Sequence, residues 1–133
     1  MTVWNEEKLI AEGYTIRNAL IKSVDLDTSE YCSCLLNLVL EGDGWGVCYG
    51  GYCLGHAGTY IKRGEIDGSK KGFDAILNIM WVLESNSLMA LKGKYCRVAT
   101  KDHISSTVKI IGHIIEDRWF DYGSFFKEDE DET

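Results

Sequence analysis

The chain has 133 residues, 45% of them apolar and 26% charged, a balance typical of one soluble globular domain rather than of a disordered chain. No apolar run approaches the roughly 20 residues that a membrane helix needs, and the N-terminus lacks a basic segment followed by an apolar one, so we expect a cytosolic protein. The formal charge of −7 disfavours duplex nucleic acid as a partner, because binding a phosphate backbone needs clustered Lys and Arg.

The first part of the chain predicts a short lead-in followed by three strands. Residues 3–12 form either an amphipathic helix or a loose segment, and Gly13 ends it. Strand-like composition predicts strands at 16–26, 31–42 and 44–55. The turn residues DTSE join the first two strands, which must be antiparallel because the connection is so short. In the second strand, one face would carry Cys32, Cys34, Leu36, Leu38 and Leu40.

The third strand, GWGVCYGGYCLG, is unusually rich in glycine and aromatic residues. Glycine inside a strand marks either a bulge or a place where a ligand or another backbone comes close. Both interpretations stay open for this segment.

A long loop at 56–72 leads into a clear helix at 69–85, which Ser69 would cap. Four cations cluster at the entrance of this helix: Lys62, Arg63, Lys70 and Lys71. A helix N-terminus with nearby cations favours an anion, so a phosphate site is one interpretation of this cluster. The alternative is a surface loop that the lysines keep solvated.

Two more strands are predicted at 95–100 and 107–117, joined by a polar turn at 101–106. The order of elements predicts an α+β domain: an antiparallel sheet of about five to six strands with one main helix packed on it. We assign residues 1–127 to this single domain. The acidic segment 128–133 is expected to form a disordered tail, because blocks of like charge repel one another.

Signals for chemistry are weak. The five cysteines lie in strand-like runs rather than in metal-binding knuckles, so Cys32 and Cys34 are interpreted as small core residues and no metal site is predicted. The sequence contains none of the motifs G-x-S-x-G, H-E-x-x-H or a Walker loop. His113 and Asp117 would share one face of the last strand, but no nucleophile accompanies them. We therefore predict no catalytic residues and no cofactor.

Four pieces of the sequence carry a resemblance to a known family: NALIKSVDL, LEGDGWGVCYGGYCL, LKGKYCRV and IGHIIEDRWFDYGSFF. Over roughly residues 16–126, and in this order, they resemble the Thoeris anti-defence protein 1 family of phages and prophages. The G-G-Y and I-G-H-I-x-x-D-x-W-F pieces are the most specific. Members of that family are sponges, which bind the glycocyclic ADP-ribose signals of Thoeris TIR enzymes without cleaving them. Some form hexamers that also hold cyclic trinucleotides of the CBASS defence at separate sites.

The resemblance implies a non-catalytic protein of the host cytoplasm that sequesters 1''-2' or 1''-3' glycocyclic ADP-ribose. It also implies a homo-oligomer, either a dimer or a hexamer, and a pocket shared between subunits would help to enclose the ligand. Phe73 is the first candidate for stacking on the adenine, with Tyr52 near it. Arg97 and Arg118 are candidates for phosphate or ribose contacts, because a guanidinium fork suits phosphate oxygens. The remaining candidates are Lys70, Lys71, His113 and Asp117.

Two other functions stay open. The protein could be an enzyme that degrades the same signals, or a protein-binding phage inhibitor whose aromatic C-terminus is its interface. Trp119 and Phe120 are expected to be anchors in the core or at an interface.

Overall fold

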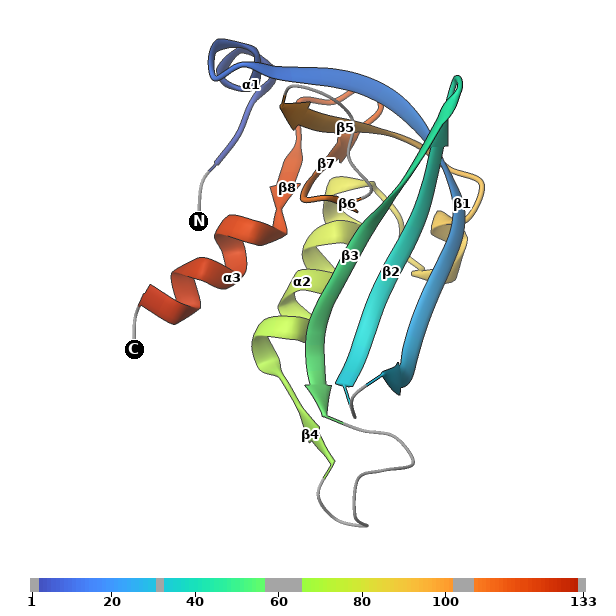
Figure 1. Ribbon diagram of the computed structural model, residues 1–133, viewed down its shortest axis with the longest axis vertical. Helices are drawn as coiled ribbons and strands as arrows, with labels where there is room; N and C mark the ends of the chain where they lie inside the picture. The colour runs from blue at the N-terminus through green and yellow to red at the C-terminus, as the bar shows by residue number, and fades with distance from the viewer. Residues whose placement is uncertain (1–2, 31–32, 57–65, 102–106, 132–133) are drawn as a thin grey trace.

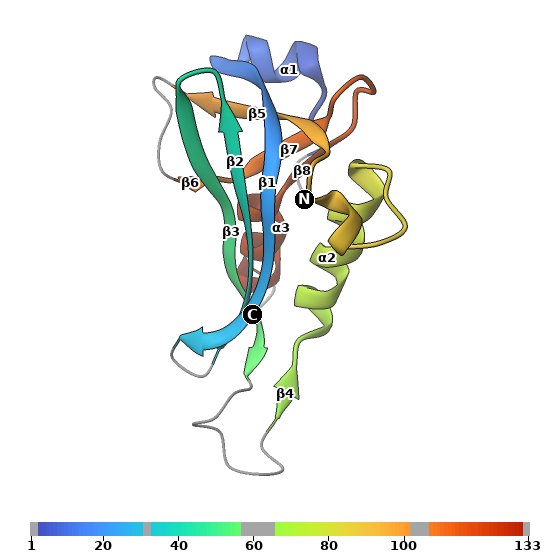
Figure 2. The same ribbon diagram turned by 90° about the vertical axis from the view of Figure 1, so that its right-hand side faces the viewer.

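The computed structural model describes residues 3–30, 33–56, 66–101 and 107–131. Its elements are α1 (Glu6–Ala11), β1 (Tyr14–Glu30), β2 (Ser33–Gly42), β3 (Trp45–His56), β4 (Asp67–Gly68), α2 (Lys70–Val82), the short 3₁₀ helix η1 (Met89–Leu91), β5 (Tyr95–Lys101), β6 (Thr107–Val108), β7 (Ile110–His113), β8 (Trp119–Asp121) and α3 (Tyr122–Asp131). Figure 1 shows the long strands β1, β2 and β3 side by side, with β5 crossing near their upper ends, and the turned view in Figure 2 shows α1 at this same end.

The strands β1, β2 and β3 form an antiparallel meander whose alternation sets the core. Leu38 pairs with Val24 of β1 on one side and with Tyr49 of β3 on the other. Leu36, Leu38 and Leu40 are fully buried, whereas Val39 between them is exposed. The predicted apolar face of this strand is therefore confirmed for the leucines. Each buried leucine contributes about 1.5–3 kcal/mol relative to an exposed one.

The later strands close the sheet into a ring. β5 pairs antiparallel with the free edge of β1, and β7 pairs antiparallel with β5. β6, which directly precedes β7, pairs in parallel with β3, so the ring runs β1–β2–β3–β6/β7–β5 and returns to β1. A five-stranded barrel with a helix between its third and fourth strands has the connectivity of the oligonucleotide/oligosaccharide-binding (OB) fold. The α+β class predicted from the sequence is confirmed.

Helix α2 packs on the barrel through its small and branched residues. Ala75, Ile79 and Val82 are buried. A Cβ on Gly72 would lie 2.6 Å from the Cα of Leu54, so the first turn of the helix sits almost directly on the backbone of β3. Because this face turns inward, Phe73, Leu77 and Trp81 are left on the other side of the helix, where they are 60%, 48% and 62% exposed.

The N-terminal segment adds a second, smaller core. The Oδ1 atom of Asn5 accepts a hydrogen bond of 2.7 Å from the backbone N–H of Lys8 and so caps α1. Leu9 is fully buried against the barrel together with Ala99, Ile110 and Trp119. The helix alternative for residues 3–12 is therefore the correct one.

The C-terminal helix α3 covers the aromatic end of β3. The ring of Tyr52 lies 4.8 Å from that of Tyr122 and 4.9 Å from that of Phe126. Helix α3 continues to Asp131, so the acidic segment 128–133 lies partly in this helix and partly outside the described residues.

The glycine pair of β3 forms a bulge. Leu36 pairs with Tyr52 and Asn37 pairs with Gly50, which leaves Gly51 as the extra residue. Gly50 and Gly51 have φ values of 118° and 81°, and a Cβ at Gly50 would collide with the carbonyl oxygen of Leu36. Of the two interpretations of this glycine-rich strand, the bulge accounts for both glycines.

Three predicted boundaries are wrong. DTSE is not a turn: β1 continues to Glu30, which pairs with Ser33, and the connection at 31–32 lies outside the described residues. The strand predicted at 107–117 ends at His113, because His113 N–H donates to the carbonyl of Arg118 and closes a hairpin turn. The predicted loop is shorter at both ends, since His56 pairs with Asp67; residues 57–65 lie outside the described residues.

The sheet also has more strands than the five or six expected. The additional ones, β4, β6 and β8, have only two or three residues each, which is too short for a periodic pattern to reveal. None of the described helices is long and apolar enough to span a membrane.

Candidate functional site

Tyr52, predicted to lie near a bound adenine, belongs to the interior. It is 8% exposed, and its hydroxyl has no hydrogen-bond partner within the described residues. Burial raises the pKa of this hydroxyl well above its usual value, with a smaller contribution from Tyr122. The ring packs against Tyr122 and Phe126 of α3 rather than facing solvent, so it is not available to stack on a ligand.

The N-terminal end of α2 combines an exposed aromatic ring with two lysines. The Oγ atom of Ser69 caps the helix by accepting from Gly72 N–H at 3.0 Å, as predicted. Lys70 Nζ donates to Asp74 Oδ2 at 2.7 Å, and this hydrogen bond raises the pKa of Lys70. Lys71 Nζ lies 4.0 Å from the ring centroid of Phe125. Both lysines therefore have intramolecular partners, although Lys70 remains exposed.

The other two cations of the predicted basic cluster, Lys62 and Arg63, lie outside the described residues. Phe73 stands beside the two described lysines with 60% of its surface exposed. An exposed phenylalanine next to a cation is a suitable platform for a flat ring that carries a phosphate.

Arg97 is a structural residue in this chain. Its residue surface is 9% exposed, its Nε donates to the carbonyl of His113 at 2.7 Å, and its Nη2 donates to the carbonyl of Glu116 at 2.9 Å. Its Nη1 pairs with Glu6 at 3.2 Å, and the guanidinium lies 4.7 Å from the ring centroid of Trp119. These contacts use the guanidinium to hold the turn between β7 and β8.

His113 and Asp117 belong to the same turn and also organise it. His113 Nδ1 accepts from the backbone N–H groups of Ile115 and Glu116 at 3.0 and 2.8 Å. Asp117 Oδ1 accepts from Trp119 Nε1 at 2.6 Å and from Glu6 N–H at 2.8 Å. The two side chains do not share the face of one strand, as the sequence predicted, because the chain reverses between them.

Arg118 differs from Arg97 because it reaches the outer surface at the C-terminal end of α2. Its Nη1 donates to the carbonyl of Trp81 at 3.1 Å, its Nη2 lies 3.5 Å from Glu84 Oε1, and the guanidinium lies 4.9 Å from the Trp81 ring centroid. Trp81 is 62% exposed. The turn that Arg97 and His113 hold thus places Arg118 against the exposed indole of Trp81.

The candidate residues form two groups at opposite ends of α2. Phe73, Lys70 and Lys71 lie at its N-terminal end, whereas Arg118 lies at its C-terminal end. Eight residues separate Phe73 from Trp81, which is about 12 Å along a helix axis. One copy of the chain therefore does not bring these groups around one small ligand. Sequence reasoning missed Trp81, although its spacing of eight from Phe73 places both on one helix face.

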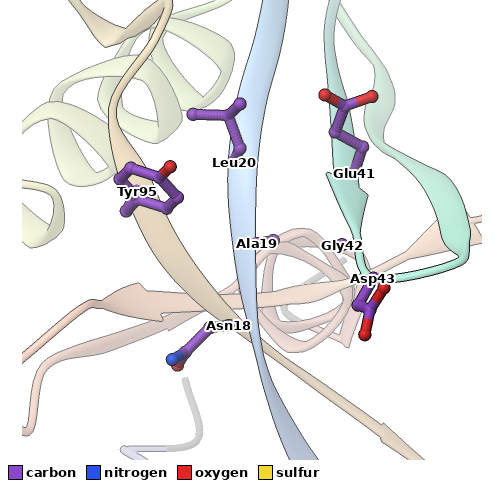
Figure 3. A pocket seen from close by; sticks show the side chains of 7 residues that line it. All are labelled: Asn18, Ala19, Leu20, Glu41, Gly42, Asp43 and Tyr95. Atoms are coloured by element: carbon purple, nitrogen blue, oxygen red, sulfur yellow. The ribbon is translucent and has the colours of Figure 1, made fainter.

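The cavities of the described residues lie elsewhere and are acidic. One of about 350 Å³ opens over β1, β2 and β5 (Figure 3), and its lining includes Glu41, Asp43 and the exposed ring of Tyr95. Another, of about 460 Å³, is lined by Glu6, Glu7, Ile10 and Asp117. Lys22 and Arg97 each pair with one of these carboxylates, Glu41 and Glu6, but neither cavity is lined by a Lys or Arg, and carboxylates in the lining repel phosphate. Neither cavity therefore suits a pyrophosphate ligand.

The outer face of the barrel does not suit a nucleic acid backbone either. OB barrels often bind oligonucleotides across their second and third strands, and such binding depends on cations that follow the backbone. The sequences of β2 and β3 contain no Lys or Arg. The fold alone therefore carries no functional conclusion.

The cysteines of the described residues differ in burial. Cys34 is half-buried, Cys96 is buried, and Cys48 and Cys53 are exposed, whereas Cys32 lies outside the described residues. Burial raises the pKa of Cys96 to about 12. The described part of the chain contains no group of three His, Cys, Asp or Glu side chains placed to hold a metal ion.

No protein family, no curated protein and no solved structure matches this chain.

Proposed function

We propose that this protein is a sponge of the host cytoplasm that binds cyclic ADP-ribose isomers and releases them unchanged, with cyclic trinucleotides as a second class of ligand. The observation that carries the proposal is the outer face of α2. Two exposed aromatic rings, Phe73 and Trp81, lie on this face, and Arg118 is fixed over one of them. A purine that carries a pyrophosphate needs a flat surface and a guanidinium, and this face offers both.

A second copy of the chain would bring the two ends of α2 together. The exposed residues Phe73, Leu77 and Trp81 are spaced by four, so they form one ridge. If two α2 helices cross antiparallel at Leu77, Phe73 of one copy meets Trp81 and Arg118 of the other. The two-fold axis also requires each contact to occur twice.

The charges at the ends of this ridge fit the same arrangement. Lys70 lies seven residues before Leu77, about 10 Å along the helix axis, and Glu84 lies seven residues after it, just beyond the C-cap of the helix. Antiparallel copies would therefore face lysine with glutamate at both ends, and opposite charges across an interface fix its register. This complementarity favours a second copy over an unrelated partner.

Release of the bound ligand tests the proposed function. Purified protein is loaded with each cyclic ADP-ribose isomer, washed, heat-denatured, and the supernatant is analysed by chromatography. We expect saturable calorimetric binding and intact ligand. Altered ligand would identify an enzyme instead, and no binding heat, with a host protein retained in a pull-down, would identify a protein-binding inhibitor.

Point variants locate the site. Phe73→Ala is expected to abolish most of the retention because it removes the stacking surface. Tyr95→Ala is the matched control, since Tyr95 is 59% exposed but lies on β5. Equal losses in both variants would contradict an α2 site.

Sedimentation equilibrium tests the second copy. Leu77→Glu places like charges at the two-fold crossing and is expected to yield monomers that retain no ligand. Leu26→Glu, at a leucine of β1 that is 53% exposed, is the control and should leave both assembly and retention unchanged. A monomeric wild-type protein that still retains ligand would refute the shared site.

A further inference from the structure

The residue that follows α2 and its C-cap has an unusual backbone conformation. Glu84 has a φ of 57° and is the one residue other than glycine with a positive φ in the described part of the chain. Its N–H donates to Trp81 and that of Ser85 donates to Met80, at 3.1 and 2.9 Å. This pair of hydrogen bonds is a Schellman motif, whose left-handed position usually holds glycine. A left-handed backbone disfavours glutamate at this position, and what offsets this cost lies in the contacts of its side chain.

The side chain of Glu84 joins two groups that are fixed from elsewhere. Its Oε2 lies 3.0 Å from His113 Nε2, and its Oε1 lies 3.5 Å from Arg118 Nη2. Because Nδ1 of His113 accepts two backbone N–H groups, the ring proton is on Nε2 and points at the carboxylate. Arg118 is held by the carbonyl and the ring of Trp81. Both donors therefore keep their positions whether or not Glu84 is present.

We propose that His113 and Arg118 form a phosphate subsite, and that the carboxylate of Glu84 occupies it as a displaceable substitute for the ligand. A carboxylate and a phosphoryl group accept from the same kinds of donor. Of the three side chains, that of Glu84 has the most room to move aside, because it is 66% exposed while those of His113 and Arg118 are 10% and 23% exposed. The C-terminal end of α2 disfavours an anion, but the Arg118 bond to the Trp81 carbonyl offsets that effect at this position.

The inference rests on the proposed function for its natural ligand, a phosphate of a cyclic nucleotide, yet it adds a regulatory element to that site. Ligand must displace Glu84, so the glutamate lowers affinity for small single phosphates and favours ligands that gain stacking contacts as well. Removing the substitute should therefore strengthen the binding of simple anions. A purely structural role for Glu84 predicts no such gain.

Inorganic pyrophosphate is the probe, titrated by calorimetry at constant ionic strength. Glu84→Gly and Glu84→Gln are expected to bind it about tenfold more tightly than wild type, the gain if Glu84 occupies the donors for about nine-tenths of the time. Glu84→Gly should also fold at least as well as wild type, since glycine adopts positive φ freely. Adding Arg118→Met to either variant should remove the gain.

Glu7→Gln is the matched control, because it removes one exposed negative charge on α1 without touching the subsite. The proposal is overturned if Glu7→Gln gains as much as the Glu84 variants, if both Glu84 variants stay within about twofold of wild type, or if the gain persists without Arg118. These outcomes are independent of whether wild type retains cyclic ADP-ribose, so failure of the proposed function would be recognised separately.

Discussion

Arg97 and Arg118, both predicted from the sequence to contact ligand, should respond very differently to the same substitution. Methionine keeps most of the length and apolar surface of arginine but removes the guanidinium. In Arg97→Met, two hydrogen bonds from a charged donor are lost, one to the buried carbonyl of His113 and one to the partly buried carbonyl of Glu116, each worth about 1.5–3 kcal/mol. The contact with the Trp119 ring adds about 0.5–2 kcal/mol, and the pair with half-exposed Glu6 adds less than about 1 kcal/mol.

We therefore expect Arg97→Met to lower the free energy of unfolding by about 4 kcal/mol, a large part of the 5–15 kcal/mol typical of a domain. For a chain of this size, that loss corresponds to about 12–16 °C in Tm. Arg118→Met should cost at most about 1 kcal/mol, because both its hydrogen bond to the Trp81 carbonyl and its ion pair with Glu84 are solvent-exposed. Urea unfolding followed by circular dichroism measures both values. In Arg118→Met, nucleotide retention should fall although the protein stays folded.

The result that would refute this reasoning is an equal loss of stability in the two variants. A loss below about 1 kcal/mol in Arg97→Met would mean that the turn between β7 and β8 holds without the guanidinium. A loss above about 2 kcal/mol in Arg118→Met would instead make Arg118 a structural residue, since exposed pairs contribute less than that.

Three further predictions concern β3. Tyr49→Phe removes a fully buried hydroxyl that has no partner within the described residues, and it should stabilise the fold by about 1 kcal/mol in urea unfolding, whereas exposed Tyr95→Phe should change nothing. Burial raises the pKa of Tyr49 and Tyr52, so the free energy of unfolding should not depend on these two groups below pH about 10 and should fall by about 1.4 kcal/mol per group and pH unit as pH rises from there toward the folded-state pKa. Tyrosinate absorbance of these residues should therefore appear together with unfolding, and ionisation before unfolding would contradict the burial. Gly50→Ala should cost about 3 kcal/mol or more, because it combines a positive φ with a collision at the Leu36 carbonyl, and a loss below about 1 kcal/mol would mean that the bulge relaxes.

Local patterns predicted the long elements because their burial follows from alternation within one segment. The leucines of β2 and the Ser69 cap of α2 are examples, since each depends on residues close in sequence. The closure of the barrel was not predictable in this way. It depends on two residues, Thr107 and Val108, which pair with a strand about sixty positions earlier.

Which face of α2 packs inward could not be read from spacing either. The series Phe73, Leu77 and Trp81 and the series Ala75, Ile79 and Val82 both fit a helical stripe. The tertiary contact decides between them, because Gly72 allows the helix to approach the backbone of Leu54, and that approach turns the small side chains inward. The larger residues are thereby left outside, where they are available to a ligand or a second copy.

Most polar side chains of the motif IGHIIEDRWF hold the turn between β7 and β8, whereas Arg118 reaches the surface. His113 Nδ1 accepts from two backbone N–H groups, Asp117 accepts from an indole N–H, and Arg97 donates to two carbonyls. Each of these groups is satisfied within the protein, whereas the Nε2 atom of His113 points away from the turn and lies 3.0 Å from Glu84 Oε2. Arg118 is the residue of this turn whose charge faces outward, over Trp81, and a rigid turn places it there without the entropic cost of ordering a free side chain on binding. A motif rich in catalytic residue types is thus better explained as a rigid support for two binding groups, Arg118 and the Nε2 atom of His113.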